Sequence, residues 1–201
     1  MKSICIVFTL LFTGLGFCQQ ELARLDSISP HFYYDIRYAT DNNFVGEAVY
    51  DCGICLLRPE AATALNKANE YFMSKGYCIQ IFDCYRPYDV QKKLWEKVPN
   101  PAYVADPYNG GSIHNRGAAI DLTLVTLEGE AVDFGTDYDF FGIEAHMDNY
   151  NHSEQVLANR KLLHDGMKLA GFKGIRTEWW HFSYTKSSGS TIMNQPLPCK
   201  N

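Results

Sequence analysis

The chain has little that would favour nucleic acid, a membrane surface or a repeat architecture. Lys and Arg number 18 against 23 Asp and Glu, and the formal net charge is -5 at pH 7. This charge gives no electrostatic attraction for nucleic acid, and no run of Lys or Arg marks an anionic membrane surface. Internal repeats, low-complexity segments and linkers are absent from the sequence. We therefore expect one folded domain, at 19–201, after a short leader.

Several hydrolase signatures are missing as well. The sequence has no His-Glu-x-x-His zinc motif and no Gly-x-Ser-x-Gly nucleophile motif. Ser183 and Lys186 match the Ser-x-x-Lys spacing of penicillin-binding proteins, but the Ser-Asp-Asn and Lys-Thr-Gly elements of that signature are absent. The sequence therefore does not support a serine nucleophile.

The first residues have the pattern of a secretory signal peptide. Lys2 supplies a positive charge, residues 4–12 form an apolar run, and small residues precede Cys18. The run is too short to span a bilayer, so we expect no membrane span in the mature chain. Residues 1–18 are thus predicted to be removed, which places the protein in the periplasm or another extracytoplasmic compartment. A lipoprotein modified at Cys18 is disfavoured by the bulky Phe17.

Seven cysteines are present, of which Cys5 and Cys18 belong to the predicted leader. The odd number that remains cannot all pair within one chain; these are Cys52, Cys55, Cys78, Cys84 and Cys199. The Cys-Gly-Ile-Cys spacing at 52–55 also occurs in zinc knuckles, but no second such pair completes a four-ligand site. One or two disulfides in an oxidising compartment are the favoured interpretation, with Cys78 and Cys84 each a possible partner of Cys52 or Cys55.

Hydrophobic periodicity predicts alternating blocks of helices and strands. The expected helices are 59–74, 87–98 and 153–170, and the expected strands are 77–83, 119–127 and 179–184. Pro59 suits the first turn of its helix, while Ser153 is an N-cap and Gly171 a terminator. The helices come in unequal blocks, so an α+β domain is favoured over a repeating βαβ sheet.

Two short segments provide the components of a catalytic zinc site. The segment 112–121 contains His114 and Asp121, and the segment 178–181 contains Glu178 and His181. Two imidazoles and one carboxylate can hold zinc with a fourth position open for water, and a spare glutamate can act as general base. The remaining histidines lack such acidic neighbours and are interpreted as structural or exposed; they are His31, His146, His152 and His164.

The spacing of Glu178 and His181 sets a structural requirement. Residues three apart on a flat strand face opposite sides of the sheet. The two side chains can share one site only if the chain bends or bulges near Trp179, or if Glu178 precedes the strand.

The motif Ser-x-His-x-x-Gly-x-Ala-x-Asp at 112–121, followed by Glu-x-Trp-His at 178–181, resembles the zinc D-alanyl-D-alanine dipeptidases of the vancomycin-resistance type. These enzymes share a fold group with D,D-carboxypeptidases and the hedgehog signalling domain. The segments 38–46, 83–87 and 135–140 resemble further parts of the family, in the right order. The resemblance implies a central, mainly antiparallel sheet with flanking helices.

The resemblance also implies a role for each matching residue. The ligands of one zinc ion would be His114, Asp121 and His181, with Glu178 as general base and acid and Arg86 stabilising the transition state. The ammonium end of a dipeptide would meet Ser112 and Asp139, with Tyr38 a weaker candidate. The chain departs from the family pattern in its cysteines at 52, 55 and 84, and the loop 103–111 is expected to reshape the pocket mouth.

The expected function is therefore an exported zinc metallopeptidase that cleaves D-Ala-D-Ala or a similar dipeptide, without an obligate protein partner. Two alternatives stay open at this point. One is a D,D- or L,D-carboxypeptidase acting on cell-wall peptides, which would depend little on Asp139. The other is a non-catalytic, zinc-stabilised binding domain. Nutrient recycling and glycopeptide resistance would use the same chemistry, so the sequence does not choose between these purposes.

Overall fold

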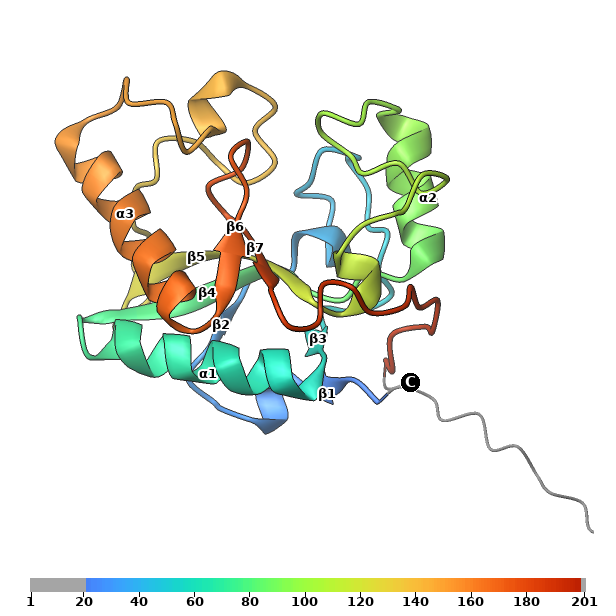
Figure 1. The fold of residues 1–201 in the computed structure, drawn as a ribbon, viewed down its shortest axis with the longest axis horizontal. Helices are drawn as coiled ribbons and strands as arrows, with labels where there is room; N and C mark the ends of the chain where they lie inside the picture. The colour runs from blue at the N-terminus through green and yellow to red at the C-terminus, as the bar shows by residue number, and fades with distance from the viewer. Residues whose placement is uncertain (1–20, 200–201) are drawn as a thin grey trace, which may run out of the picture.

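The computed structural model describes residues 21–199, so the predicted signal peptide at 1–18 lies outside the described residues. The elements follow the order β1 (Ala23–Arg24), η1 (Leu25–Ser27), β2 (Tyr33–Tyr34), η2 (Arg37–Ala39), β3 (Leu56–Leu57), α1 (Pro59–Met73), β4 (Tyr77–Asp83), α2 (Tyr88–Lys97), η3 (His114–Arg116), β5 (Ala119–Thr126), η4 (Ile143–Ala145), α3 (Glu154–Leu169), β6 (Phe172–Gly174) and β7 (His181–Tyr184). The η elements are single turns of 3-10 helix. This composition confirms the predicted α+β class (Figure 1).

A five-stranded sheet forms the centre of the molecule, in the order β2-β4-β5-β7-β6. Its β2–β4 pair is parallel and its other pairs are antiparallel, as a mainly antiparallel sheet requires. Strands β1 and β3 pair separately in a two-stranded sheet. The longest strands, β4 and β5, are central neighbours, and most of their residues are buried.

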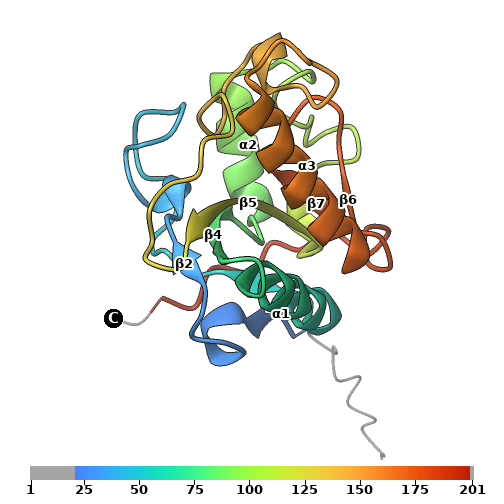
Figure 2. The same cartoon turned by 90° about the vertical axis from the view of Figure 1, so that its left-hand side faces the viewer.

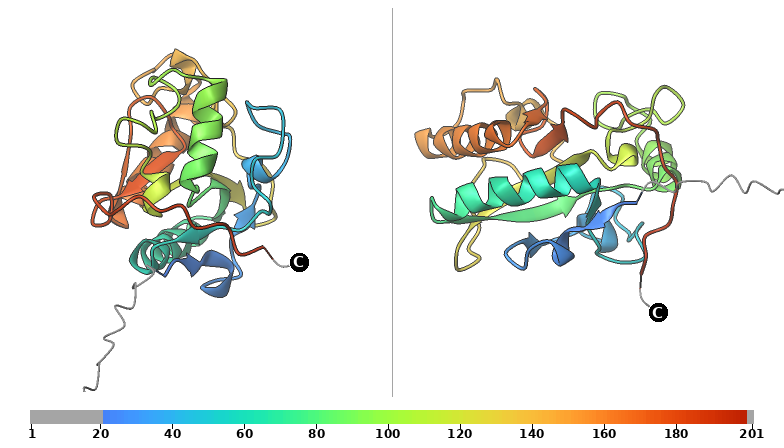
Figure 3. Two further views of the ribbon diagram at one scale, coloured as in Figure 1. Left: turned by 90° about the vertical axis from the view of Figure 1, so that its right-hand side faces the viewer. Right: turned by 60° about the horizontal axis from the view of Figure 1, so that its bottom comes forward.

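The helices lie on two sides of this sheet. Helices α1 and α3 contact each other, with α1 packed on β4 and α3 on β6 (Figure 3). Helix α2 lies on the opposite side of the sheet from α1, as two perpendicular views show (Figures 1 and 2). The predicted cap and terminator of α3 are both confirmed. The Ser153 hydroxyl accepts from the Val156 N–H at the start of the helix, and Gly171 adopts a φ of +91° after its end.

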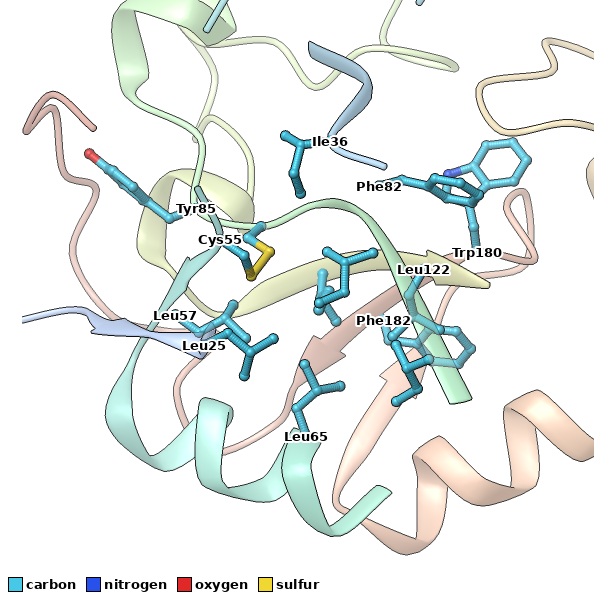
Figure 4. Close-up of a cluster of buried hydrophobic side chains, with 14 of the residues drawn as sticks. Leu25, Ile36, Cys55, Leu57, Leu65, Phe82, Tyr85, Leu122, Trp180 and Phe182 are labelled. Carbon is cyan, nitrogen blue, oxygen red and sulfur yellow. A yellow bond between two sulfur atoms is a disulfide. The ribbon is translucent and has the colours of Figure 1, made fainter. Parts of the chain in front are cut away.

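A large part of the hydrophobic core lies between α1 and the sheet. Leu65 of α1 points toward the strands that carry Leu122 and Phe182, and all of these side chains are buried (Figure 4). A second group of buried rings lies where Tyr138 donates to Asp121, on the other face of the sheet: Phe82 and Trp180 both contact the ring of Tyr138, with centroid separations of 4.8 and 5.5 Å. Burying such large apolar side chains contributes about 1.5–3 kcal/mol each. The core therefore holds β4, β5 and β7 in a fixed register.

Strand β4 changes register near its end, and the change determines which face Asp83 occupies. Ile81 lies opposite Leu122, whereas Asp83 lies opposite Asp121 after a register shift between the two pairs. Uninterrupted alternation would put Asp83 on the same face as Ile81, toward the apolar core. The bulge instead places Asp83 beside Asp121, on the other face of the sheet.

The last predicted strand is shorter than expected. It begins at His181 rather than at Trp179, and Glu178 lies in the irregular segment before it. The chain thus meets the spacing requirement by placing the glutamate ahead of the strand. Both tryptophans at 179–180 are buried and belong to the core.

Two disulfides join the cysteines of the described chain. They link Cys55 to Cys84 and Cys52 to Cys199, and Cys78 is free and buried. The prediction of one or two disulfides is confirmed, and Cys84 pairs with one of its two expected partners. The pairing with Cys199 was not anticipated. Within residues 21–199, none of the helices has both the length and the apolarity to cross a membrane.

Candidate metal and substrate site

Three acidic or imidazole side chains lie side by side across three strands. Asp121 on β5 is directly opposite both Asp83 on β4 and His181 on β7. Directly opposed residues in antiparallel strands share a face, so the three form a row on the face away from Leu122. Alternation along β5 likewise turns Asp121 away from the face of Leu122 and Leu124.

His114 reaches the same row from the short helix η3. This helix ends at Gly117, whose φ of +64° closes the turn and whose carbonyl accepts from the Arg58 N–H at 2.9 Å. A Cβ at Gly117 would lie 2.6 Å from the Leu22 side chain, so the position favours glycine on both grounds. The turn brings β5 back immediately, which lets a loop histidine and a strand aspartate converge.

His114, Asp121 and His181 offer ligand atoms that all lie within 4.8 Å of one another. The Asp121 Oδ1 atom is 2.9 Å from His181 Nδ1 and 3.3 Å from His114 Nε2, and the two ring nitrogens are 3.2 Å apart. All three side chains are buried. The three residues expected to bind a metal are therefore gathered at one point.

The other nitrogen of each imidazole has its own acceptor. His114 Nδ1 lies 2.7 Å from the Cys84 carbonyl oxygen, and His181 Nε2 lies 3.1 Å from Ser183 Oγ. When these nitrogens carry the protons, lone pairs of both rings point at each other and at the Asp121 carboxylate. Such convergent lone pairs suit a cation, and two imidazoles plus one carboxylate are donors that zinc accepts.

The electrostatics of the three ligands point the same way. Burial disfavours the imidazolium form of His114, but the Asp121 carboxylate outweighs it and raises the pKa of His114. Burial alone would raise the pKa of Asp121, yet His114 and His181 hold it far below its usual range. The hydroxyl of Tyr138 donates to Asp121 Oδ2 at 2.9 Å and fixes the carboxylate further. Asp121 therefore stays ionised, and its carboxylate favours a bound cation.

Glu178 lies beside these ligands without being one of them. Its Oε2 atom is 3.9 Å from His181 Nδ1, and its side chain is 23% exposed. Burial raises the pKa of Glu178 to about 7, and the carboxylates of Asp121 and Asp139 add to the effect. A carboxyl group with a pKa near neutrality can exchange a proton with a substrate or with water.

Arg86 is buried and held on three sides. Its Nε and Nη2 atoms donate to Asp83 Oδ2 at 3.0 and 2.6 Å, and Nη1 donates to Gln91 at 2.9 Å. Its guanidinium also lies 5.0 Å from the ring centroid of Tyr38. Burial lowers the pKa of Arg86, but Asp83 outweighs this and keeps the group charged. These contacts occupy three of five N–H groups, so two remain for a ligand.

A second polar group lies around Asp139. The Tyr38 hydroxyl donates to Asp139 Oδ2 at 2.9 Å, and burial raises the pKa of Asp139 to about 8. Asp139 has a φ of +56°, a conformation that costs free energy for residues other than glycine. Ser112 is buried, and its Oγ accepts from the N–H of His114 at 3.2 Å.

The site residues predicted from the sequence line one cavity of about 250 Å³. The expected metal ligands, the glutamate, the arginine and the three expected substrate contacts are all in its wall; they are Tyr38, Arg86, Ser112, His114, Asp121, Asp139, Glu178 and His181. The structure thus brings together every residue singled out from the sequence. The loop after α2 supplies another part of the wall, at 101–105 and 111–113, as expected for the pocket mouth.

Several supporting residues were missed in the sequence. Asp83 holds Arg86, Tyr138 holds Asp121, and Ser183 accepts from His181. Ser183 has a signal that was available, because it lies two residues after His181 on one strand and so shares its face. Asp83 had none, because its face depends on the bulge.

Comparisons with known proteins match almost the whole chain. A family model described as D-ala-D-ala dipeptidase matches residues 18–200. The D-alanyl-D-alanine dipeptidase of Escherichia coli (strain K12) is 36% identical over 179 residues, covering 89% of this chain and 92% of that protein. The D-alanyl-D-alanine dipeptidase of Enterococcus faecium is 32% identical over 178 residues, covering 79% of this chain and 88% of that protein.

One solved structure that aligns with this chain is more distant. The LdcB LD-carboxypeptidase aligns with a TM-score of 0.43 and 24% sequence identity, over 64% of this chain and 59% of that chain.

Proposed function

Because this chain belongs to the D-Ala-D-Ala dipeptidase family, we propose that it hydrolyses D-alanyl-D-alanine or a similar D,D-dipeptide with one zinc ion. The observation that carries the proposal is the position of Glu178 and Arg86 in the wall of the same cavity as the His114, Asp121 and His181 cluster. A metal site, a buried base and a buried cation within one small cavity are the components of peptide hydrolysis.

In this proposal His114 and His181 contribute neutral imidazoles and Asp121 a carboxylate. Zinc held there would supply Lewis acidity toward the attacking water and the peptide carbonyl. The Cys84 carbonyl and Ser183 fix the orientation of the two rings through their hydrogen bonds. Tyr138 does the same for Asp121, so the ligands are positioned before a metal arrives.

Glu178 moves the protons of the reaction. As a carboxylate it accepts a proton from the attacking water, and it then delivers that proton to the nitrogen of the leaving amine. Its pKa of about 7 suits both steps, because the group gains and loses a proton near neutral pH. Its partial burial excludes much of the solvent that would otherwise compete for the proton.

Arg86 stabilises the charge that develops on the carbonyl oxygen. Its two N–H groups that do not bind Asp83 or Gln91 are available to donate to this oxygen. Because the guanidinium is already held by those two residues, little reorganisation is needed when the charge appears.

The amino end of the dipeptide is assigned to Asp139. A carboxylate facing an ammonium group selects a free amino terminus, which distinguishes a dipeptidase from a carboxypeptidase. Tyr38 supports this carboxylate through its hydroxyl, and Ser112 lines the same cavity. The arriving ammonium favours ionisation of Asp139, whose pKa of about 8 keeps it partly protonated when the site is empty.

We further propose that the protein works outside the cytoplasm after loss of residues 1–18. Two disulfides support an oxidising compartment, since such bonds persist mainly in exported proteins. The cleavage of a cell-wall dipeptide is consistent with that location.

The test is hydrolysis of D-Ala-D-Ala by the mature protein, purified, treated with a chelator and reloaded with zinc. We expect activity that disappears with the metal and returns with zinc, and a loss of about 10³-fold or more in kcat for Glu178→Ala. Absence of dipeptide turnover with zinc bound would overturn the proposal in favour of a binding domain. Faster turnover of a pentapeptide, insensitive to Asp139→Ala, would favour a carboxypeptidase.

A further inference from the structure

Three aromatic side chains from separate segments meet beside the cavity. Phe44 follows η2, Tyr103 follows α2, and Phe141 precedes η4. The ring of Phe141 stacks on that of Tyr103 with centroids 4.6 Å apart and an interplanar angle of 21°, and its centroid is 5.1 Å from that of Phe44. We call Phe44, Phe141 and Tyr103 the ring bridge, because Phe141 joins two loops that are distant in sequence.

The ring bridge borders the space in which a substrate would lie. Phe44 and Tyr103 are in the wall of the 250 Å³ cavity. Phe141 lines a second cavity of about 20 Å³, which shares Tyr103, Asp139 and Glu178 with the first. A space of that size holds about one water molecule and no amino-acid residue. The room beyond Asp139 is therefore closed on the side of Phe141.

The ring bridge is also connected to Asp139, the carboxylate assigned to the substrate's ammonium. Phe141 is two residues after Asp139 in the chain. Phe44 lies edge-on to Tyr38, at a centroid distance of 6.1 Å, and the Tyr38 hydroxyl donates to Asp139. Phe141 thus shares a cavity wall with Asp139, and Phe44 packs on the tyrosine that binds it.

We infer that the ring bridge limits the enzyme to dipeptides by closing the position before the substrate's first residue. This inference rests on the proposed function and identifies residues that set its substrate length. One more residue at the amino end extends a peptide by about 3.5 Å. That residue would have to pass Asp139 and separate the stacked rings of Tyr103 and Phe141.

Removing one ring should open the closed position without disturbing the reaction centre. Tyr103 is 42% exposed and Phe141 is partly buried, so the ring bridge is at the surface rather than in the core. Phe141 is not part of the wall of the 250 Å³ cavity, whereas its two partners are. Phe141→Ala is therefore the most selective variant.

The experiment compares kcat/KM for D-Ala-D-Ala and for D-Ala-D-Ala-D-Ala, using zinc-loaded protein. For Phe141→Ala we expect the tripeptide value to rise about tenfold or more, with a smaller change for the dipeptide. Phe141→Tyr retains the stacked ring and should keep the wild-type preference. Tyr150→Ala is the matched control, because Tyr150 is 76% exposed and lies outside both cavities.

The outcomes separate the two proposals. Wild-type protein that cleaves the dipeptide, together with a Phe141→Ala variant that gains no tripeptide activity, would overturn the ring-bridge inference alone. Wild-type protein that cleaves neither peptide would overturn the proposed function.

In that case calorimetric binding of the tripeptide to zinc-loaded Glu178→Gln, with and without Phe141→Ala, tests the ring bridge without turnover. Tripeptide affinity should rise about tenfold with Phe141→Ala, and an unchanged affinity refutes the inference. Tyr103→Ala replaces Phe141→Ala if the latter does not fold.

Discussion

Asp83 and Asp121 lie directly opposite each other on neighbouring strands, and the guanidinium of Arg86 lies next to both. Its Nη2 atom is 2.6 Å from Asp83 Oδ2 and 4.0 Å from Asp121 Oδ2. Two like charges in opposed positions destabilise a sheet unless a cation compensates them. Arg86 therefore links the Asp83 carboxylate to that of Asp121, which is expected to bind the metal. Asp83 fixes the position of the Arg86 guanidinium.

Asp83→Asn should lower activity by releasing Arg86. The amide keeps an acceptor for the Tyr50 hydroxyl, which donates to Asp83 Oδ1 at 2.6 Å, but removes the charge that faces the guanidinium. We expect a loss of about 10²-fold in kcat/KM and of about 3–5 kcal/mol in the free energy of unfolding. Steady-state kinetics and urea denaturation provide the measurements.

A double-mutant cycle with Arg86→Lys is the control for this prediction. If Asp83 acts through Arg86, Asp83→Asn should cost much less in kcat/KM when Arg86 is already lysine. Zinc content should stay at one ion per chain in every variant. Fully additive losses would show that Asp83 acts independently of Arg86.

The pH profile of activity should have an acid limb that belongs to Glu178. Burial raises the pKa of this group to about 7, and only its carboxylate can accept a proton from water. A bound cation lowers that pKa, so kcat/KM for D-Ala-D-Ala should fall about tenfold per pH unit below a midpoint at or under about pH 7. Glu178→Gln should bind zinc normally and show no such limb in its residual activity. An acid limb that persists in Glu178→Gln would assign the titration to another group.

Asp139→Asn should stabilise the protein at high pH while weakening substrate binding. The pKa of Asp139 is raised to about 8 in the folded protein, so the folded state holds its proton where the unfolded state has lost it. The contribution of Asp139 to stability is therefore largest below about pH 4 and is lost as pH rises to about 8. Asparagine tolerates the positive φ at this position, which makes it a matched replacement.

The measurement for Asp139→Asn is urea denaturation at pH 5 and at pH 9. We expect the variant to gain on the order of 1 kcal/mol relative to wild type at pH 9 and less at pH 5. The KM for D-Ala-D-Ala should rise at least tenfold through loss of the ammonium partner. An equal stability difference at both pH values would contradict the assigned pKa.

The two disulfides should have different effects on activity. Cys84 lies between Asp83 and the Arg86 segment, and its carbonyl accepts from His114. Removing the Cys55–Cys84 bond with a double alanine variant should cost about 4 kcal/mol of stability and also reduce kcat/KM. Removing the Cys52–Cys199 bond, whose cysteines are 147 residues apart, should cost about 5 kcal/mol with little change in kcat/KM.

Both disulfide variants are assayed at a temperature at which circular dichroism shows them folded. The comparison is made between the two variants, since each lacks one bond and carries two alanines. Equal effects on kcat/KM would show that the position of Cys84 next to the site does not matter.

Much of the fold could be predicted because local signals agree with the tertiary structure. The cap at Ser153, the proline at Pro59 and the glycine at Gly171 mark helix ends that the structure reproduces. The strands β4 and β5 follow from their alternation. The short strands β1, β3 and β6 were not predicted, because two or three residues carry no detectable period.

The candidate site divides in a similar way. Chemically distinctive side chains such as His114 and Glu178 could be identified from the sequence, and the position of Glu178 followed from its spacing to His181. The residue that holds Arg86 could not be identified in this way, because its position depends on the register shift that places Asp83 opposite Asp121. Alternation along residues 77–83 predicts the other face for Asp83. The ring bridge was likewise hidden, since its residues come from three loops without regular structure.

The volume of the main cavity has a consequence for inhibition. Pockets that hold drug-sized molecules usually enclose about 300–1,000 Å³, and this one encloses about 250 Å³ with polar walls. A competitive inhibitor therefore has to be a compact zwitterion, with a cationic end for Asp139 and a metal-binding anionic centre. An inhibitor extended past Asp139 would have to part Tyr103 from Phe141.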